Sequence, residues 1–236
     1  MKTLKIQAVS KLADKFRNLS PSADFVPEWY RKSSGTMKDR NSSLAFENPK
    51  VTTSTYKKCT PFLEAMINGY TVHLTSDVEV TTNKEGYPYL LSRSGKLSVL
   101  AIHPEPQWKG LSIPHGYHQA VFKFENNFIF NTPDGYSALF THPLNRFDLP
   151  FQVISGFVDT DKFNLPVNFP FFLQEGFQGI IEAGTPIAQI HLIKRDVWNR
   201  EYVDANSDDT DYAIEKLLTR IKRTYKHYYW TRKEYK

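Results

Sequence analysis

The chain has 236 residues, of which 40% are hydrophobic and 14% aromatic, and it carries a formal net charge of +5. A chain of this length and composition can bury a substantial core, which excludes the disordered class of proteins. The single cysteine, Cys59, excludes an intrachain disulfide and a zinc site built from cysteines, and it favours a reducing compartment.

The positive charge is concentrated at the two ends of the chain. Residues 1–40 hold nine Lys and Arg against four Asp and Glu, and residues 216–236 hold eight against one, so residues 41–215 carry −7. Basic ends can contact nucleic acid, or they can dock on the acidic body of a neighbouring subunit. No apolar run approaches the roughly 20 residues that cross a bilayer, so we expect no membrane contact.

The N-terminal region, residues 1–54, is predicted to form an arm with a short amphipathic helix. Apolar residues recur about one helical turn apart in this region, at Leu4, Ala8, Leu12, Phe16 and Leu19. Trp29 and Tyr30 follow in a polar stretch. Large aromatic side chains contribute most when they are buried, so we expect these two to anchor the arm on the body or on a partner.

A short helix is predicted to begin at Thr60-Pro61 and to end at Gly69. Thr60 suits the N-cap, Pro61 suits the first helical position, and glycine is the usual residue after the last turn.

The central region, residues 55–198, is predicted to be one β-rich domain. Short apolar runs separated by turn residues occur at 70–74, 78–80, 97–102, 120–124, 128–130, 136–140, 151–158, 167–173, 179–182 and 187–193. Alternating β and α units would need helices of ten or more residues between these strands. The pattern therefore favours a mainly β fold of jelly-roll or β-clip type.

Residues 199–236 are predicted to form a linker and a basic C-terminal helix. Asp208 and Asp209 can cap a helix with an apolar face from Ile214 to Tyr228. The aromatic residues Tyr225, Tyr228 and Trp230 lie among Lys and Arg residues. We expect these aromatics to dock on a protein surface, and stacking on the bases of a nucleic acid is the alternative.

Several segments, read in chain order, resemble the strand pattern of the dUTPase and dCTP deaminase superfamily. They are Gly69-Tyr70, Asp77-Val78, Pro133-Asp134-Gly135-Tyr136, Asn145-Arg146, Gly156-Phe157-Val158-Asp159 and Gly184-Thr185-Pro186-Ile187-Ala188-Gln189-Ile190. The resemblance implies a dUTPase-like β scaffold over about residues 69–193. It also implies a Mg²⁺-dependent nucleotide site with Asp159 beside the sugar and the attacking water, and with Gln189 on the phosphate strand.

Other catalytic features of that superfamily have no counterpart in this chain. Thr71, Val72 and His73 stand where an acidic residue is expected after Gly69-Tyr70, and Pro143-Leu144-Asn145 replaces the Ser-rich phosphate turn. No glycine follows Gly184 to form a phosphate-closing loop. Asn145 and Arg146 remain candidates for nucleotide binding, although for Arg146 the favoured role is an ion pair with Asp148 that fixes the loop.

The chain is also similar to a family of uncharacterised tailed-phage proteins, over most of its length. The segments that carry this resemblance are Pro27-Glu28-Trp29-Tyr30, Lys58-Cys59-Thr60-Pro61-Phe62-Leu63 and the run from His142 to Phe151. It implies a protein of the host cytoplasm during infection, or of the virion.

We therefore expect a non-catalytic binding or assembly protein without a cofactor. It would form a homo-oligomer, with a trimer by analogy to dUTPases. The alternative is a nucleotide-binding or nucleotide-processing enzyme that uses Asp159 and Mg²⁺. We expect no metal site from the histidines, because His115 and His118 lack the His-x-His spacing that places two imidazoles on one strand face.

Overall fold

The computed structural model describes residues 2–38, 52–93, 97–203 and 224–236. These residues form two compact units. The first unit contains residues 1–25, 67–195 and 235–236, and the second contains residues 26–66 and 196–234. The expected boundaries at residues 54 and 198 do not coincide with this division, and an independent domain at 55–198 stays a prediction.

The first unit is built on two antiparallel sheets. The five-stranded sheet has the order β13 (Gly156–Val158), β11 (Tyr136–Thr141), β16 (Pro186–Lys194), β5 (Tyr70–His73) and β2 (Leu19–Pro21). The four-stranded sheet has the order β12 (Phe151–Val153), β14 (Phe169–Gln174), β9 (Tyr117–Phe124) and β8 (Leu100–Ile102). The mainly β fold class is thereby confirmed.

Smaller elements complete the first unit. A three-stranded sheet contains β15 (Gly179–Ile181), β6 (Val78–Thr82) and β7 (Pro88–Ser92), and a two-stranded sheet contains β1 (Lys5–Ala8) and β10 (Phe128–Asn131). The 3-10 turns are η1 (Ala13–Lys15), η2 (Ser22–Phe25) and η4 (Glu105–Gln107).

Phenylalanine side chains dominate the core of the first unit. Phe124 on β9 and Phe171 on β14 are fully buried, and their rings stack with centroids 4.0 Å apart. Phe151 packs edge-on against Phe124 at 5.0 Å. Alternate residues of each strand point to the same face, so the period-2 apolar pattern of the sequence becomes one continuous core.

The second unit contains α1 (Glu28–Lys32), β3 (Thr36–Lys38), β4 (Thr52–Ser54), η3 (Tyr56–Lys58), α5 (Thr224–Tyr228) and all but the last residue of α3 (Thr60–Ile67). Its centre is an aromatic cluster of Trp29, Tyr30, Tyr56 and Phe62, in which Tyr30 stacks on Phe62 at 6.0 Å.

No helix in the described part of the chain is long and apolar enough to cross a membrane.

The helix predicted near Thr60 is confirmed, with its start one residue earlier. The amide of Leu63 donates to the carbonyl of Cys59, so Cys59 holds the N-cap position and Thr60 is the first helical residue. Gly69 follows the helix with φ +81°.

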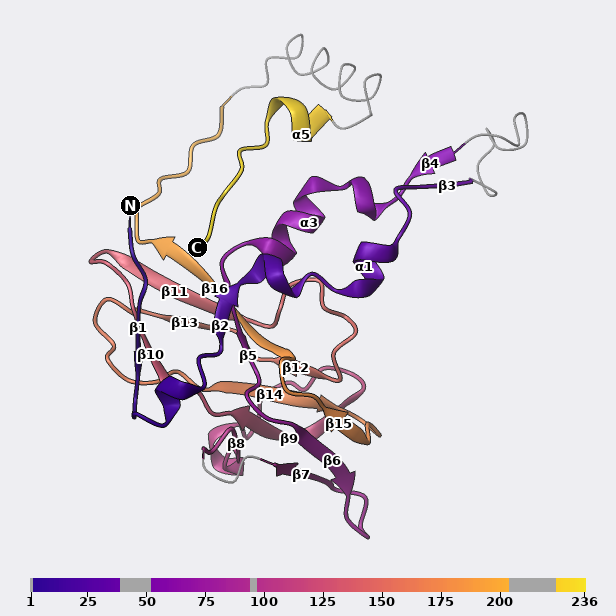
Figure 1. Ribbon diagram of the computed structural model, residues 1–236, viewed down its shortest axis with the longest axis vertical. Coiled ribbons are helices and arrows are strands. Elements are labelled where there is room, and N and C mark those ends of the chain that lie inside the picture. Colours follow the sequence, from indigo (N-terminus) through magenta and orange to yellow (C-terminus); the bar gives the residue numbers. More distant parts are fainter. Residues whose placement is uncertain (1, 39–51, 94–96, 204–223) are drawn as a thin grey trace. The chain divides into compact units, whose positions relative to one another are not determined.

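The predicted amphipathic helix over residues 4–19 is wrong. This segment forms β1, the 3-10 turn η1 and the start of β2, and β1 lies beside β10 with Ile6 opposite Phe130 (Figure 1). Backbone pairing with a neighbouring strand outweighs the small helix preference of the local sequence.

The run at 151–158 is also two strands rather than one. β12 joins the four-stranded sheet and β13 joins the five-stranded sheet. Of the predicted C-terminal helix, residues 208–223 lie outside the described residues, and Thr224–Tyr228 is helical.

Candidate functional site

Gln189 connects two loops through its buried carboxamide. It lies on β16 opposite Thr141 of β11 and is 1% exposed. Its Nε2 donates to the carbonyl of Asn68 at 2.6 Å, and its Oε1 accepts from the amide of Leu144 at 2.8 Å. Both ends of the amide are therefore used to hold the turn after α3 and the loop after β11.

Asn145 lies in a tight turn of that same loop. The amide of Arg146 donates to the carbonyl of Pro143 at 3.2 Å, and Asn145 has φ +59°. It is the one non-glycine residue with positive φ among those that the structure describes. Asparagine tolerates this left-handed conformation better than most residues, which gives Asn145 a structural reason to be there.

Arg146 forms the ion pair with Asp148 that the spacing allowed. Its Nε and Nη2 each donate to a carboxylate oxygen of Asp148 at 2.9 Å, and Nη1 donates to the carbonyl of Phe25 at 3.3 Å. The Arg146 side chain is 13% exposed. A phosphate at this position would have to compete with a bidentate carboxylate.

His142 holds the base of the loop. Its Nδ1 accepts from the amide of Val153 at 3.4 Å, which leaves Nε2 to donate to the carbonyl of Arg146 at 3.1 Å. Burial lowers the pKa of His142, because the imidazolium would lose its hydration. The ring is therefore neutral near pH 7 and acts as a fixed linker.

Asp159 belongs to a second polar cluster, centred on Arg195. Its Oδ1 accepts from the Ser137 hydroxyl at 2.6 Å and from Arg195 Nη1 at 3.2 Å. The Asp159 side chain is 54% exposed, so it is the accessible member of the cluster.

Asp161 is the buried carboxylate of the same cluster. Its side chain is 3% exposed, accepts from the amide of Gly135 at 2.9 Å and forms a two-point ion pair with Arg195. The hydrogen bond from the guanidinium lowers the pKa of Asp161 to about 2. Arg195 also donates to Ser137 Oγ at 2.8 Å and to the carbonyl of Tyr136 at 3.0 Å.

No pattern in the sequence points to Arg195, because only the antiparallel register of β11 and β16 places it here. Tyr136 is opposite Lys194, so Arg195 comes directly beyond the start of β11.

The two clusters lie toward opposite ends of β11. Ser137, near its start, contacts Asp159, whereas Thr141, at its end, is opposite Gln189. Ser137 and Thr141 are four positions apart along the strand, which corresponds to about 13 Å. Within one chain, the structure brings Asn145, Arg146 and Gln189 into one loop region and leaves Asp159 apart from them.

The aromatic candidates for partner binding differ in exposure. Tyr30 is 3% exposed within the aromatic cluster of the second unit, and Trp230 donates through Nε1 to Glu64 at 2.9 Å. Trp29 is half-buried, whereas Tyr225 and Tyr228 are 44% and 70% exposed.

An exposed apolar segment, residues 196–203, was missed by the sequence reasoning. It has no helix or strand, and each of its four large apolar side chains is at least 80% exposed: Val197 (96%), Trp198 (86%), Tyr202 (92%) and Val203 (80%). The available signal was the occurrence of Trp198 and Tyr202 in an otherwise polar stretch.

The described residues contain no group of three or more His, Cys, Asp or Glu side chains placed to hold a metal ion. The Asp159–Asp161 pair is occupied by the guanidinium of Arg195.

No protein-family model and no curated protein matches this sequence. Among solved structures, the chain is similar to a mutant dUTPase from phage phi11 of S. aureus. The identity is 10%, the TM-score is 0.35, and the match covers 87% of this chain and 97% of that chain. The resemblance is a weak one of fold, and it assigns neither an activity nor a residue role to this chain.

Proposed function

We propose that this protein is a non-catalytic, phage-type assembly protein that forms homo-oligomers through residues 196–203. The observation that carries the proposal is the exposure of Val197, Trp198, Tyr202 and Val203 in one extended segment. Single exposed apolar residues are common on protein surfaces. Four within seven residues form an apolar patch, and its burial by another molecule lowers the free energy. Tryptophan and tyrosine are the residues most often found at the energetic centre of an interface.

The charge distribution supports a second copy of this chain as the occupant. Residues 41–215 carry −7, whereas residues 1–40 and 216–236 carry +5 and +7. A basic end of one copy is complementary to the acidic body of the next, which orients association and raises its rate. The host cytoplasm or the virion would be the place of this assembly.

The polar clusters support a non-catalytic role. Arg146 is held by Asp148, and both ends of the Gln189 amide are held by backbone groups. Asp159 lies with Arg195, away from both. A nucleotide would have to displace several short internal hydrogen bonds, each of which leaves a polar group unpaired when broken.

The test compares the association of the full chain with that of a variant carrying Trp198→Ser and Tyr202→Ser. Sedimentation velocity should show a concentration-dependent oligomer for the unmodified chain. The variant should dissociate at roughly 30-fold higher concentration or more, because truncating an interface hot spot costs about 2 kcal/mol.

Phe147→Ser is the matched control, because Phe147 is 81% exposed but lies outside residues 196–203. It should leave the oligomer unchanged. A strictly monomeric unmodified chain, or an oligomer that tolerates the double substitution, would refute the proposal. Binding of DNA or RNA by the monomer, with affinity falling steeply with salt, would point to the nucleic-acid role of the basic C-terminal region instead.

A further inference from the structure

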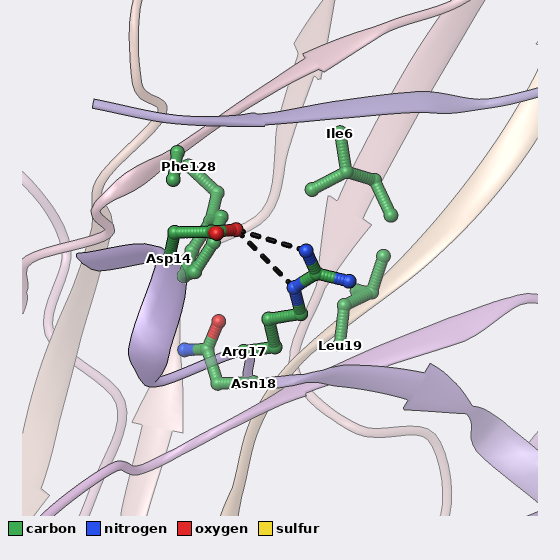
Figure 2. Close-up of a pocket in the computed structure, with 7 residues that line it drawn as sticks. Ile6, Asp14, Arg17, Asn18, Leu19 and Phe128 are labelled. Atoms are coloured by element: carbon green, nitrogen blue, oxygen red, sulfur yellow. Dashed lines mark hydrogen bonds and ion pairs between the residues drawn. The ribbon is translucent and has the colours of Figure 1, made fainter. Parts of the chain in front are cut away.

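A cavity of about 370 Å³ lies in the first unit, in the segment where the sequence predicted a helix. Its lining residues come from β1, η1 and the residues around them, the start of β2, and β10 (Figure 2): Ile6, Ala8, Asp14, Arg17, Asn18, Leu19 and Phe128. This volume falls within the range of about 300–1,000 Å³ that is typical of small-molecule sites.

One of the lining residues, Asn18, has a buried acceptor without a partner. Asn18 is 8% exposed, and its Nδ2 donates to the carbonyl of His73 at 3.0 Å. Its Oδ1 is buried and accepts no hydrogen bond in the structure. The bond to His73 fixes which end of the amide faces the cavity, so the oxygen is directed toward the Phe128 side (Figure 2).

A buried acceptor of this kind selects for a ligand that donates a hydrogen bond. Leaving it unsatisfied is costly, whereas a single N–H or O–H group at the right position removes that cost.

The other walls of the cavity are apolar. Ile6, Ala8 and Leu19 contribute aliphatic side chains, and Phe128, which is 5% exposed, contributes an aromatic ring. Such walls favour a ligand with a planar, apolar ring over a sugar or a free ion.

The mouth of the cavity carries one cation and one anion. Arg17 donates through Nε and Nη2 to Asp14 Oδ1 at 3.2 and 3.1 Å, and the Arg17 and Asp14 side chains are 78% and 57% exposed. An exposed pair like this is weak, so the guanidinium can move onto the face of a bound ring. The pair has no net charge, which favours a neutral ligand.

We propose that this cavity binds a neutral heteroaromatic ring whose N–H group donates to Asn18 Oδ1. The ring lies against Phe128, Ile6 and Leu19, and the guanidinium of Arg17 covers its outer face. Indole-type and nucleobase-type rings share this chemistry. The site is independent of the oligomer proposed above, because none of its residues lies in residues 196–203.

The experiment titrates the full chain, labelled with ¹⁵N, with indole, 1-methylindole and uracil. Indole or uracil should shift the side-chain amide signal of Asn18 and the backbone amide signals around Phe128. 1-Methylindole keeps the ring but lacks the donor, so it should bind about tenfold more weakly than indole or worse. Tighter binding of indole than of uracil would identify the ligand as indole-type, and tighter binding of uracil would identify it as nucleobase-type.

Two variants separate binding from folding. Asn18→Ala removes the acceptor and should make indole and 1-methylindole bind equally, whereas Ala8→Leu fills the cavity and should abolish the shifts. Dispersed spectra show that each variant is folded. Equal binding of the two indoles to the unmodified chain, or the absence of shifts with both indole and uracil, would overturn the proposal without reference to any variant.

Discussion

Gln189 and Asn68 are joined by a 2.6 Å hydrogen bond between a side chain on β16 and the backbone that follows α3. The same carboxamide accepts from Leu144 in the loop after β11. One buried side chain therefore fixes two loops that are far apart in the sequence. The contacts of Gln189 in this chain are structural, because both ends of its amide are bonded to backbone groups.

Replacement of Gln189 by methionine should destabilise the protein while preserving side-chain volume. Two backbone groups, the Asn68 carbonyl and the Leu144 amide, would lose their partner, and each costs about 1–3 kcal/mol when it is buried. The free energy of unfolding from urea titration measures the loss. Gln152→Met is the control because Gln152 is exposed on β12, and an equal loss in both variants would contradict this role.

Replacement of Gly69 by alanine should be more damaging than replacement of Gly86. Both glycines have positive φ, +81° and +84°. An alanine in this left-handed conformation costs about 1–2 kcal/mol, so both variants should lose this much stability. A Cβ at Gly69 would lie 2.0 Å from the carbonyl oxygen of Ile190, whereas a Cβ at Gly86 meets nothing within 4 Å. Thermal unfolding should show a markedly larger loss for Gly69→Ala, and equal losses would mean that the close approach to β16 is not maintained in solution.

The free energy of unfolding should fall as the pH drops below about 6.5. Burial lowers the pKa of His73, His142 and His191 from their ordinary value of 6.5. The unfolded chain therefore binds more protons than the folded chain in this range, and acid favours unfolding. The stability that depends on these neutral rings is complete above pH 6.5 and is lost as the pH falls through their lower folded-state pKa values.

Urea titrations at pH 7.5 and 5.5 measure this dependence. His142→Gln should reduce the difference between the two pH values, because it removes one of the buried titrating rings. His115→Gln is the control, since His115 is exposed. A pH difference that His142→Gln leaves unchanged would assign the effect to other groups.

Addition of dUTP and Mg²⁺ should leave the melting temperature unchanged if the protein is not a nucleotide enzyme. A ligand that binds only the folded state adds about 2.7 kcal/mol at 100 times its Kd, so binding would be visible as a rise. The full set of deoxynucleoside triphosphates is tested in the same way, with release of pyrophosphate as the second readout. Turnover that Asp159→Asn abolishes and Asp134→Asn preserves would establish the enzymatic alternative.

The β class and the helix at 60–67 followed from the sequence, because both depend on local patterns. Alternating apolar residues specify which face of a strand is buried, and Pro61 with Gly69 limits where a helix can run. These signals extend over one element and require no knowledge of its neighbours.

The tertiary structure decided which strands pair and which distant side chains contact one another. The apolar spacing from Leu4 to Leu19 is compatible with a helix, yet residues 5–8 form a strand that pairs with β10. The register of β11 against β16 placed Arg195 beside Asp159 and set Gln189 at the other end of the same strand. Such contacts join residues more than 30 positions apart. Local spacing is compatible with several strand registers, and the register observed is the one that gives the whole sheet the lowest free energy.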